Sequence, residues 1–108
     1  MKTYMLDDKP VKVGKDAKEN WDLLDQAHPE HWIFHLADYP SCYVIWENES
    51  KEITKNFAQC AGVICANNTK YRHLSGLKVE YCKVKNAEKG NVMGEFSYKG
   101  SIKTVRVS

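Results

Sequence analysis

The stretch that decides the fold reads His31-Trp32-Ile33-Phe34-His35-Leu36-Ala37-Asp38-Tyr39-Pro40-Ser41-Cys42-Tyr43-Val44-Ile45-Trp46. Two dense apolar runs, Trp32–Leu36 and Tyr43–Trp46, enclose the turn-like segment Asp38–Ser41. Aromatic and β-branched residues favour strands, whereas Asp and Pro interrupt them. We therefore predict two strands joined by a tight connection. Because neither run alternates with polar residues, we expect this pair to form the centre of a sheet.

The composition is typical of one folded, soluble domain. A chain of 108 residues can bury a modest core, and 43% of it is hydrophobic and 28% charged. No apolar run approaches the roughly 18 residues of a membrane span, and the acidic residues after Leu6 argue against a signal peptide. We therefore expect a cytoplasmic protein whose four cysteines are free thiols. Their spacings contain no CxxC pair, so we predict neither a metal site nor a cofactor.

The charge is distributed unevenly along the chain. Residues 1–68 carry 7 lysines and 11 acidic residues, whereas residues 69–108 carry 9 basic and 3 acidic residues. A basic segment with aromatic residues is a candidate for contact with a polyanion. The alternative is a solvated strand surface decorated with lysines, and charge alone favours that alternative.

Outward from the central stretch, the pattern predicts two helices and further strands. Segments 3–6 and 11–13 predict a β-hairpin around Asp7–Pro10. A helix over about 17–27 follows, with Asp16 and Glu19 as a capping box. Ser50 is the candidate cap of a second helix that ends near Asn67 and Asn68, with these residues on its apolar face: Ile53, Phe57, Cys60, Ala61 and Ile64.

The last third predicts strands over 77–85, from Val92-Met93 onward, and over 101–107. The expected fold is therefore α+β: a β-hairpin, a helix, two central strands, a helix and a C-terminal β-meander, with a mostly antiparallel sheet.

Several segments together resemble the RNA-binding module of the NFACT proteins. Val13–Asn20 resembles that family's "GrxaxeN" segment, and Trp32–His35 with Asp38–Ile45 resembles its "W-F-H-x-x-d-x-P-G-S-H-V" motif. Thr69–Arg72 resembles its "S-K-x-R", and Val79–Lys85 resembles its "V-d-Y-t-x-x-k" strand. The likeness runs from about residue 10 to the end, which suggests a single NFACT-R-like domain over 1–108. The motif residues with an expected structural role are Gly14, Asn20, Trp32, Phe34, Asp38 and Pro40.

The chain departs from that family at three adjacent positions. Ser41, Cys42 and Tyr43 stand where the family has Gly, Ser and His. Loss of the glycine can reshape the turn, because glycine alone adopts strained backbone conformations freely. The long companion regions of full NFACT proteins are also absent.

The resemblance implies a non-catalytic RNA-binding domain that contacts tRNA or rRNA in a ribosome-associated setting, in ribosome quality control. Lysine and arginine supply affinity for phosphate, and aromatic rings beside them can stack on unpaired bases. At the start of the first helix, backbone N–H groups also favour phosphate. We expect the RNA contacts to come from Lys15, Lys18, His35, Lys70, Tyr71, Arg72, His73, Lys83 and Lys85. Lys70 and Arg72 can equally serve as helix-terminal cations, and core packing is the favoured interpretation of His35. For Asn20 a structural hydrogen bond to the central turn is favoured over RNA contact, and Asp38 is interpreted as a turn-making residue before Pro40.

Three alternatives are open at this stage. A Cys42–His35 catalytic pair oriented by Asp38 is disfavoured, because nothing in the sequence activates the thiol at a strand start. A metal site drawn from His28, His31, His35 and Cys42 is disfavoured, because His31 and His35 lie roughly 13 Å apart on a strand. A DNA-binding or protein-interaction module is the main alternative, since phosphate contacts do not distinguish DNA from RNA.

Overall fold

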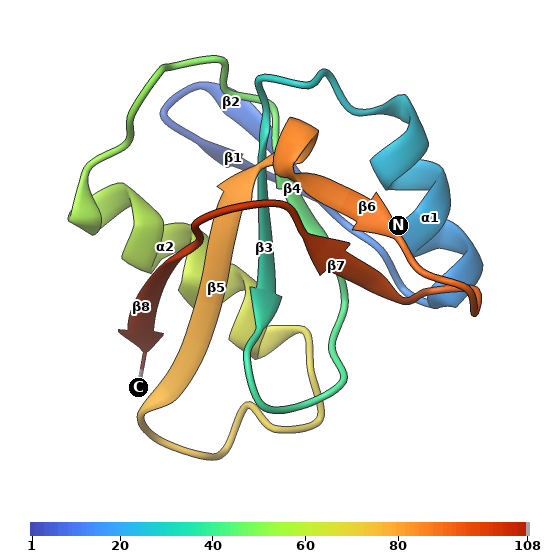
Figure 1. Ribbon diagram of the computed structural model, residues 1–108. Coiled ribbons are helices and arrows are strands. Elements are labelled where there is room, and N and C mark those ends of the chain that lie inside the picture. The colour runs from blue at the N-terminus through green and yellow to red at the C-terminus, as the bar shows by residue number, and fades with distance from the viewer. Residues whose placement is uncertain (108) are drawn as a thin grey trace.

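The structure, a computed structural model, describes residues 1–107 and has the predicted α+β fold (Figure 1). Two helices accompany a six-stranded antiparallel sheet and a separate two-stranded hairpin. Within residues 1–107, neither helix is long and apolar enough to cross a bilayer. The elements are β1 (Lys2–Leu6), β2 (Lys9–Val13), α1 (Ala17–Gln26), β3 (Trp32–Leu36), β4 (Val44–Trp46), α2 (Lys55–Asn67), β5 (Leu77–Lys83), the 3₁₀ turn Val84–Asn86, β6 (Ala87–Lys89), β7 (Phe96–Tyr98) and β8 (Lys103–Val107).

The two strands of the deciding stretch lie at the centre of the sheet, as predicted. The strand order is β1-β2-β4-β3-β5-β8, and Trp32 pairs with Trp46 and Phe34 with Val44 across the central antiparallel ladder. Their connection, residues 37–43, is a loop rather than the tight turn expected.

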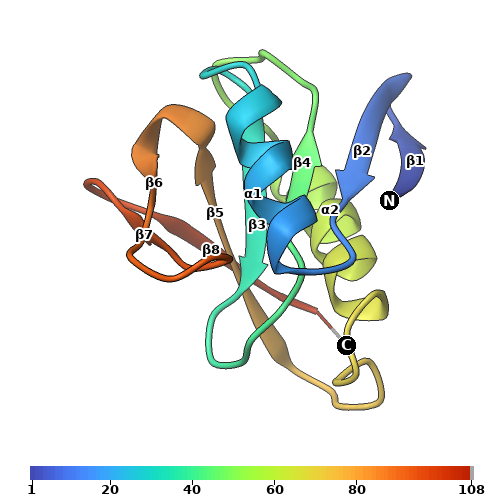
Figure 2. The ribbon, with the colours of Figure 1, turned by 90° about the vertical axis from the view of Figure 1, so that its right-hand side faces the viewer.

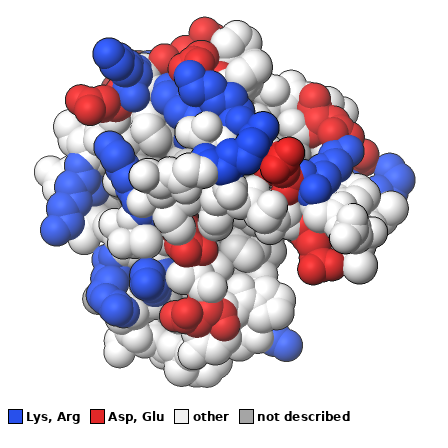
Figure 3. Space-filling view, in the orientation of Figure 1, with Lys and Arg blue, Asp and Glu red and all other residues white. Residues whose placement is uncertain are grey.

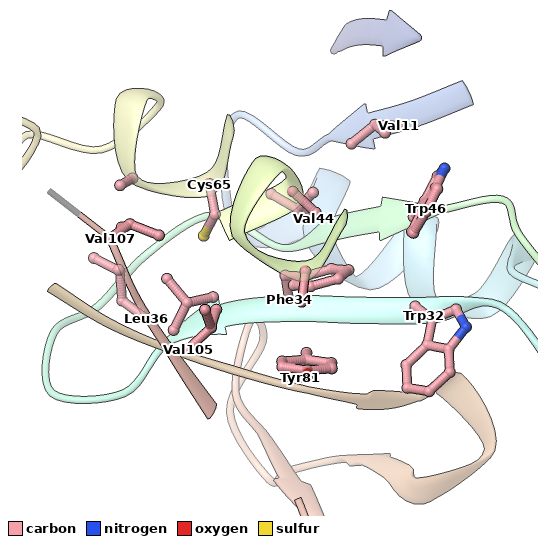
Figure 4. Packing of buried hydrophobic residues seen from close by; sticks show 14 of the residues in the cluster. Val11, Trp32, Phe34, Leu36, Val44, Trp46, Cys65, Tyr81, Val105 and Val107 are labelled. Atoms are coloured by element: carbon pink, nitrogen blue, oxygen red, sulfur yellow. The ribbon is translucent and has the colours of Figure 1, made fainter. Parts of the chain in front are cut away.

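Side chains of the central strands alternate between two buried clusters, one on each face of the sheet. Trp32 and Phe34 pack under α2 in the larger cluster (Figure 4), whereas Ile33 and Ile45 face Leu24 of α1 in the smaller one. The two helices therefore cover opposite faces of the sheet (Figure 2). This double coverage explains why both central strands read as continuous apolar runs.

The N-terminal hairpin forms as predicted, around a two-residue turn. Asp7 and Asp8 both have positive φ, 53° and 60°, and Leu6 pairs with Lys9. This is the geometry of a two-residue hairpin turn, which Asp tolerates better than most residues.

The helix starts differ in how well the sequence predicted them. The Asp16 carboxylate accepts the Glu19 backbone N–H at 2.9 Å and caps α1 as predicted. The predicted cap of α2 was wrong: Thr54, not Ser50, accepts from the Phe57 N–H. The carbonyl of Ser50 accepts instead from the indole of Trp32, which keeps that segment irregular.

The buried face of α2 also differs in part from the predicted one. Cys60 is exposed rather than buried. Ala58, Ala61 and Cys65 supply most of the buried contacts, because small side chains let α2 approach the sheet closely.

The C-terminal strands do not form the predicted meander. β5 pairs directly with β8, whereas β6 and β7 pair only with each other. The 3₁₀ turn after β5 takes the chain off the sheet, and Phe96 of β7 then packs against the cluster on the α1 face. Val92 and Met93, predicted to start a strand, lie in the exposed connection between β6 and β7.

Candidate nucleic-acid interface

Five segments that are distant in sequence meet around a cavity of about 770 Å³, which we call the lysine groove. Its walls are the N-terminal residues Met1 and Lys2, the start of α1 with the residues before it, loop residues 40–42, residues 68–70 after α2, and residues 93–95. The start of α1, the loop after β3 and the end of α2 lie in the middle and lower part of the molecule in Figure 2. A volume of this size is in the range of small-ligand sites.

The lysine groove brings together lysines from three of these regions. Lys2, Lys15 and Lys70 line it, and none of their ammonium groups makes an ion pair with another residue between 1 and 107. Two carboxylates also line it, Asp16 and Glu95, but Asp16 is occupied as the helix cap. Three unpaired ammonium groups therefore remain available for an anionic ligand.

On the face of the molecule that Figure 3 shows, the lysine and arginine side chains do not form one continuous positive surface. In the view of Figure 3, lysine and arginine side chains are interspersed with acidic ones. A candidate binding site is therefore better sought where cations from separate segments meet than in the charge balance along the sequence.

The start of α1 already carries two carboxylates. Asp16 accepts from the Glu19 N–H, and the Glu19 carboxylate accepts from the Lys15 N–H at 3.0 Å. These negative charges interact favourably with the positive end of the helix dipole and compete with an anionic ligand there. The expectation that the backbone there favours phosphate stays a prediction, with these two carboxylates against it.

An aromatic pair adjoins the lysine groove. The rings of Tyr39 and Tyr71 stack with centroids 4.3 Å apart and an interplanar angle of 28°. The Lys70 ammonium lies 5.5 Å from the Tyr71 ring centroid. Tyr71 packs against the larger buried cluster, whereas Tyr39 is 38% exposed. Sequence reasoning missed Tyr39 because its neighbours marked the segment as a turn; the signal was an aromatic side chain beside Pro40.

The three departures from the family motif each have a structural role in the loop. The Ser41 hydroxyl accepts the Leu36 backbone N–H at 3.0 Å, and the Cys42 thiol lies 3.8 Å from the Cys65 carbonyl oxygen. The Tyr43 hydroxyl donates to the Gly94 carbonyl at 2.6 Å. Burial raises the pKa of Tyr43 to about 12, so the phenol remains a donor at neutral pH. Ser41 and Tyr43 thus fix the loop and the opposite wall of the groove.

Gly14 and Asn20 lock the same loop from the other side. The Asn20 side-chain oxygen accepts the Tyr43 backbone N–H at 3.1 Å, and the Gly14 N–H donates to the Tyr43 carbonyl at 3.1 Å. A Cβ at position 14 would collide with the Asn20 amide, so only glycine fits. The turn-making role expected of Asp38 falls to Ser41 instead, because within residues 1–107 the Asp38 carboxylate has no hydrogen bond.

The wall at residues 93–95 is pinned to α1. A Cβ on Gly94, which has φ +91°, would lie 2.7 Å from the Ala17 Cβ. The indole of Trp21 donates to the Glu95 carbonyl at 2.9 Å. The backbone at this point therefore requires glycine, both for its conformation and for the close approach.

Lys83 lies inside the protein, away from the groove. It is 8% exposed, and its ammonium donates to the carbonyls of Glu30 at 2.7 Å and Ser50 at 2.5 Å while lying 4.5 Å from the Trp32 ring centroid. Burial lowers its pKa, and the Glu30 carboxylate opposes that shift. We therefore leave Lys83 out of the candidate site.

Two other predicted cations are engaged in ion pairs at the surface. Lys85 donates to Glu30 at 2.7 Å, and Lys18 to Asp22 at 2.9 Å. Arg72 and His73 are exposed and follow Lys70 on the same segment. Of the predicted contacts, Lys15 and Lys70 line the groove, and Tyr71, Arg72 and His73 follow Lys70 directly in the chain.

His35 is partly buried and packs against aromatic rings, in line with the favoured interpretation. Its ring contacts Phe96 and Tyr43 edge-on, with centroids 5.1 and 5.8 Å apart. Burial lowers its pKa below the ordinary 6.5, so the ring is neutral at pH 7 and carries no charge for phosphate. It lines a smaller cavity of about 360 Å³ together with Glu80 and Tyr98.

The cysteines are all free, and two of them adjoin. The Cys65 thiol lowers the pKa of Cys42 by hydrogen bonding, and the same contact together with burial raises that of Cys65. The thiol of Cys42 lies against α2, whereas the His35 ring lies against Phe96, so the two halves of the suggested catalytic pair have different neighbours.

Among residues 1–107, one cluster of possible metal ligands forms, and its members differ from the set that the sequence disfavoured. Ligand atoms of His28, His31 and Glu49 lie within 4.8 Å of one another. However, the Nδ1 atoms of the two histidines accept backbone N–H groups, at 3.0 Å from Glu30 and 3.4 Å from His28. With each Nδ1 acting as an acceptor, each Nε2 carries a proton, and the two Nε2 atoms lie 4.0 Å (His28) and 3.9 Å (His31) from carboxylate oxygens of Glu49. Protonated Nε2 atoms suit contact with a carboxylate better than with a cation.

Comparison with known proteins gives a likeness in structure only. No family model matches the sequence, and no curated protein matches it. One similar solved structure is the C-terminal part of the fibronectin/fibrinogen-binding protein from Streptococcus suis, with a TM-score of 0.85 and 26% sequence identity. The match covers 98% of this chain and 44% of that one, so the present chain spans less than half the length of its structural relative.

Proposed function

We propose that this chain is an NFACT-like module that binds RNA, with tRNA or rRNA as the ligand, in a ribosome-associated and cytoplasmic setting. The likeness to the C-terminal part of a fibronectin/fibrinogen-binding protein supports the fold that this proposal assumes. The sequence motifs from Val13 to Ile45 support the proposed relation to the NFACT family. The lysine groove supports RNA binding itself, because Lys2, Lys15 and Lys70 line it and make no ion pair within residues 1–107, although Asp16 and Glu95 line it too.

The groove suits a phosphate backbone for a physical reason. Each phosphate that a lysine neutralises releases a condensed counterion, so affinity falls with salt by a slope of about 0.7–0.9 per contact. Three lysines around one cavity predict a slope of about 2 to 3 from the groove alone. Arg72 and His73, exposed next to Lys70, extend the contact surface.

Charge reversal in the groove tests the proposal. Lys15→Glu with Lys70→Glu should weaken binding of a fluorescently labelled RNA by more than tenfold near 0.1 M salt and lower the salt slope by about 2. The matched control is Lys99→Glu with Lys103→Glu, which changes net charge equally on exposed residues outside the groove. Equal losses in both double variants, measured by anisotropy, would show that total charge rather than this groove governs binding.

DNA is the second candidate ligand, because lysine–phosphate contacts do not distinguish the two nucleic acids. The same anisotropy assay with DNA of identical sequence separates them. An RNA module should bind the RNA more tightly, whereas tighter binding of the DNA would replace the proposal with its alternative.

A further inference from the structure

We infer that the lysine groove takes a single strand, with one unpaired base stacked on Tyr39 and the flanking phosphates held by Lys15 and Lys70. This inference rests on the proposed function and names the form of nucleic acid that the site selects. The observations that carry it are the aromatic pair, the apolar wall of the groove and the position of the lysines.

The aromatic pair is a prepared stacking platform. Tyr71 packs against the buried cluster, and Tyr39 stacks on it at 4.3 Å, so the inner ring supports the outer one. With its inner face covered by Tyr71, the 38% of Tyr39 that is exposed lies on its edges and outer face. A nucleic-acid base that stacks on Tyr39 therefore meets a ring that is already ordered, and the protein needs little rearrangement to bind it.

The groove beside the platform has an apolar wall. Val13, Ala17, Pro40 and Met93 line it, and Met93 is 54% exposed. A duplex presents phosphates, sugars and the edges of paired bases, and none of these gains from an apolar wall. An unpaired base offers an aromatic face that can cover these side chains.

The charges lie where a stacked strand would need them. The Lys70 ammonium is 5.5 Å from the Tyr71 ring centroid, at the junction of platform and groove. Lys15 lines the same cavity from the segment before α1. A base on Tyr39 therefore has a cation available on the Lys70 side, and the strand can continue through the groove toward Lys15.

The wall formed by residues 93–95 is held by several contacts, which favours selection by shape. Tyr43 and Trp21 both bond the backbone of residues 94–95, and Gly94 touches Ala17 too closely for any side chain. A groove with fixed walls admits a single strand more readily than it could widen for a duplex.

The test compares a single-stranded RNA of mixed sequence with a hairpin duplex of the same base composition, at equal phosphate number. We expect the single strand to bind at least tenfold more tightly. Tyr39→Leu, which keeps apolar bulk but removes the ring, should lower single-strand affinity by about tenfold and leave duplex affinity unchanged, whereas Tyr39→Trp should retain it. A 2-aminopurine in the strand should be quenched by the wild-type protein and not by Tyr39→Leu.

The outcomes separate this inference from the function on which it rests. Equal binding of strand and duplex, or a loss in Tyr39→Leu that is the same for both, overturns the inference while charge reversal at Lys15 and Lys70 still reports on RNA binding. If neither RNA binds the wild-type protein, the proposed function fails and the inference fails with it.

Discussion

Replacing Lys83 by methionine separates a structural lysine from a ligand-binding one. Methionine keeps the apolar stem on the Trp32 ring but removes the ammonium that donates to the carbonyls of Glu30 and Ser50. Hydrogen bonds to charged groups contribute about 1.5–3 kcal/mol each. Ser50 retains the Trp32 indole as a donor, and the buried ammonium no longer has to be desolvated.

The expected net loss in the free energy of unfolding is therefore about 2–4 kcal/mol, from the hydrogen-bond range just given. For a domain of this size that lowers Tm by about 10 °C or more. Urea denaturation followed by tryptophan fluorescence measures it directly. The RNA affinity of the folded Lys83→Met variant, measured well below its Tm, should stay within about twofold of that of the wild-type protein.

The matched control for this experiment is Lys85→Met. Lys85 pairs with the same Glu30, but half of its side chain is exposed, so solvent screens the pair and the stability change should be much smaller. Similar destabilisation by the two substitutions, or a large loss of RNA affinity in the folded Lys83 variant, would refute the assignment of Lys83 to the interior.

Three further predictions concern the walls of the groove and the buried histidine. Gly94→Ala should destabilise the protein by about 1–3 kcal/mol more than Gly100→Ala, because both glycines have positive φ but only Gly94 would also collide with Ala17; equal effects in urea denaturation would argue against the collision. Tyr43→Phe should cost about 1 kcal/mol by removing the bond to the Gly94 carbonyl, and amide exchange at residues 94–95 should accelerate; unchanged exchange would show that the wall is held by other contacts. Because burial lowers the pKa of His35, its neutral form favours the folded state: this stability is complete above pH 6.5 and is lost as the pH falls through the lowered pKa. His35→Gln should therefore lose less stability than wild type between pH 7.5 and pH 5, and an equal loss in both proteins would contradict the assignment.

The elements predicted correctly are those that local chemistry determines. The apolar runs of β3 and β4 read as buried strands because both faces of the sheet are covered. Asp16 is a strong cap with a clear helix after it, and two adjacent aspartates can turn a hairpin with positive φ. In each case the residues that specify the element lie within a few positions of one another.

The elements predicted incorrectly depend on contacts between distant residues. Thr54 displaces Ser50 as the cap because the Ser50 carbonyl accepts from Trp32 and Lys83. In the sequence, Lys83 resembles any lysine in a strand. Only the packing of the segments around Glu30 and Ser50 shows that it is buried. β5 pairs with β8 rather than with the next strand in the chain, because β6 and β7 form a separate hairpin. No local feature of the sequence indicates this arrangement.

The candidate site also combines residues that the sequence indicated locally with residues that only the tertiary structure reveals. The sequence pointed to Lys15 and to the Lys70–Arg72 segment separately, and the fold places Lys15 and Lys70 on one cavity. Lys2 and Tyr39 were missed, because a lysine in an edge strand and a tyrosine in a turn have ordinary explanations. Only the tertiary arrangement gives them a shared surface.

An amide chemical-shift titration of the labelled protein with the single-stranded RNA tests the central claim most directly. The account predicts that the largest shifts fall on Lys15, Tyr39, Lys70 and Gly94, all in or beside the walls of the lysine groove, and that the resonances of β8 change little. Shifts concentrated on β8 and the exposed face of α2, with the groove unaffected, would contradict it.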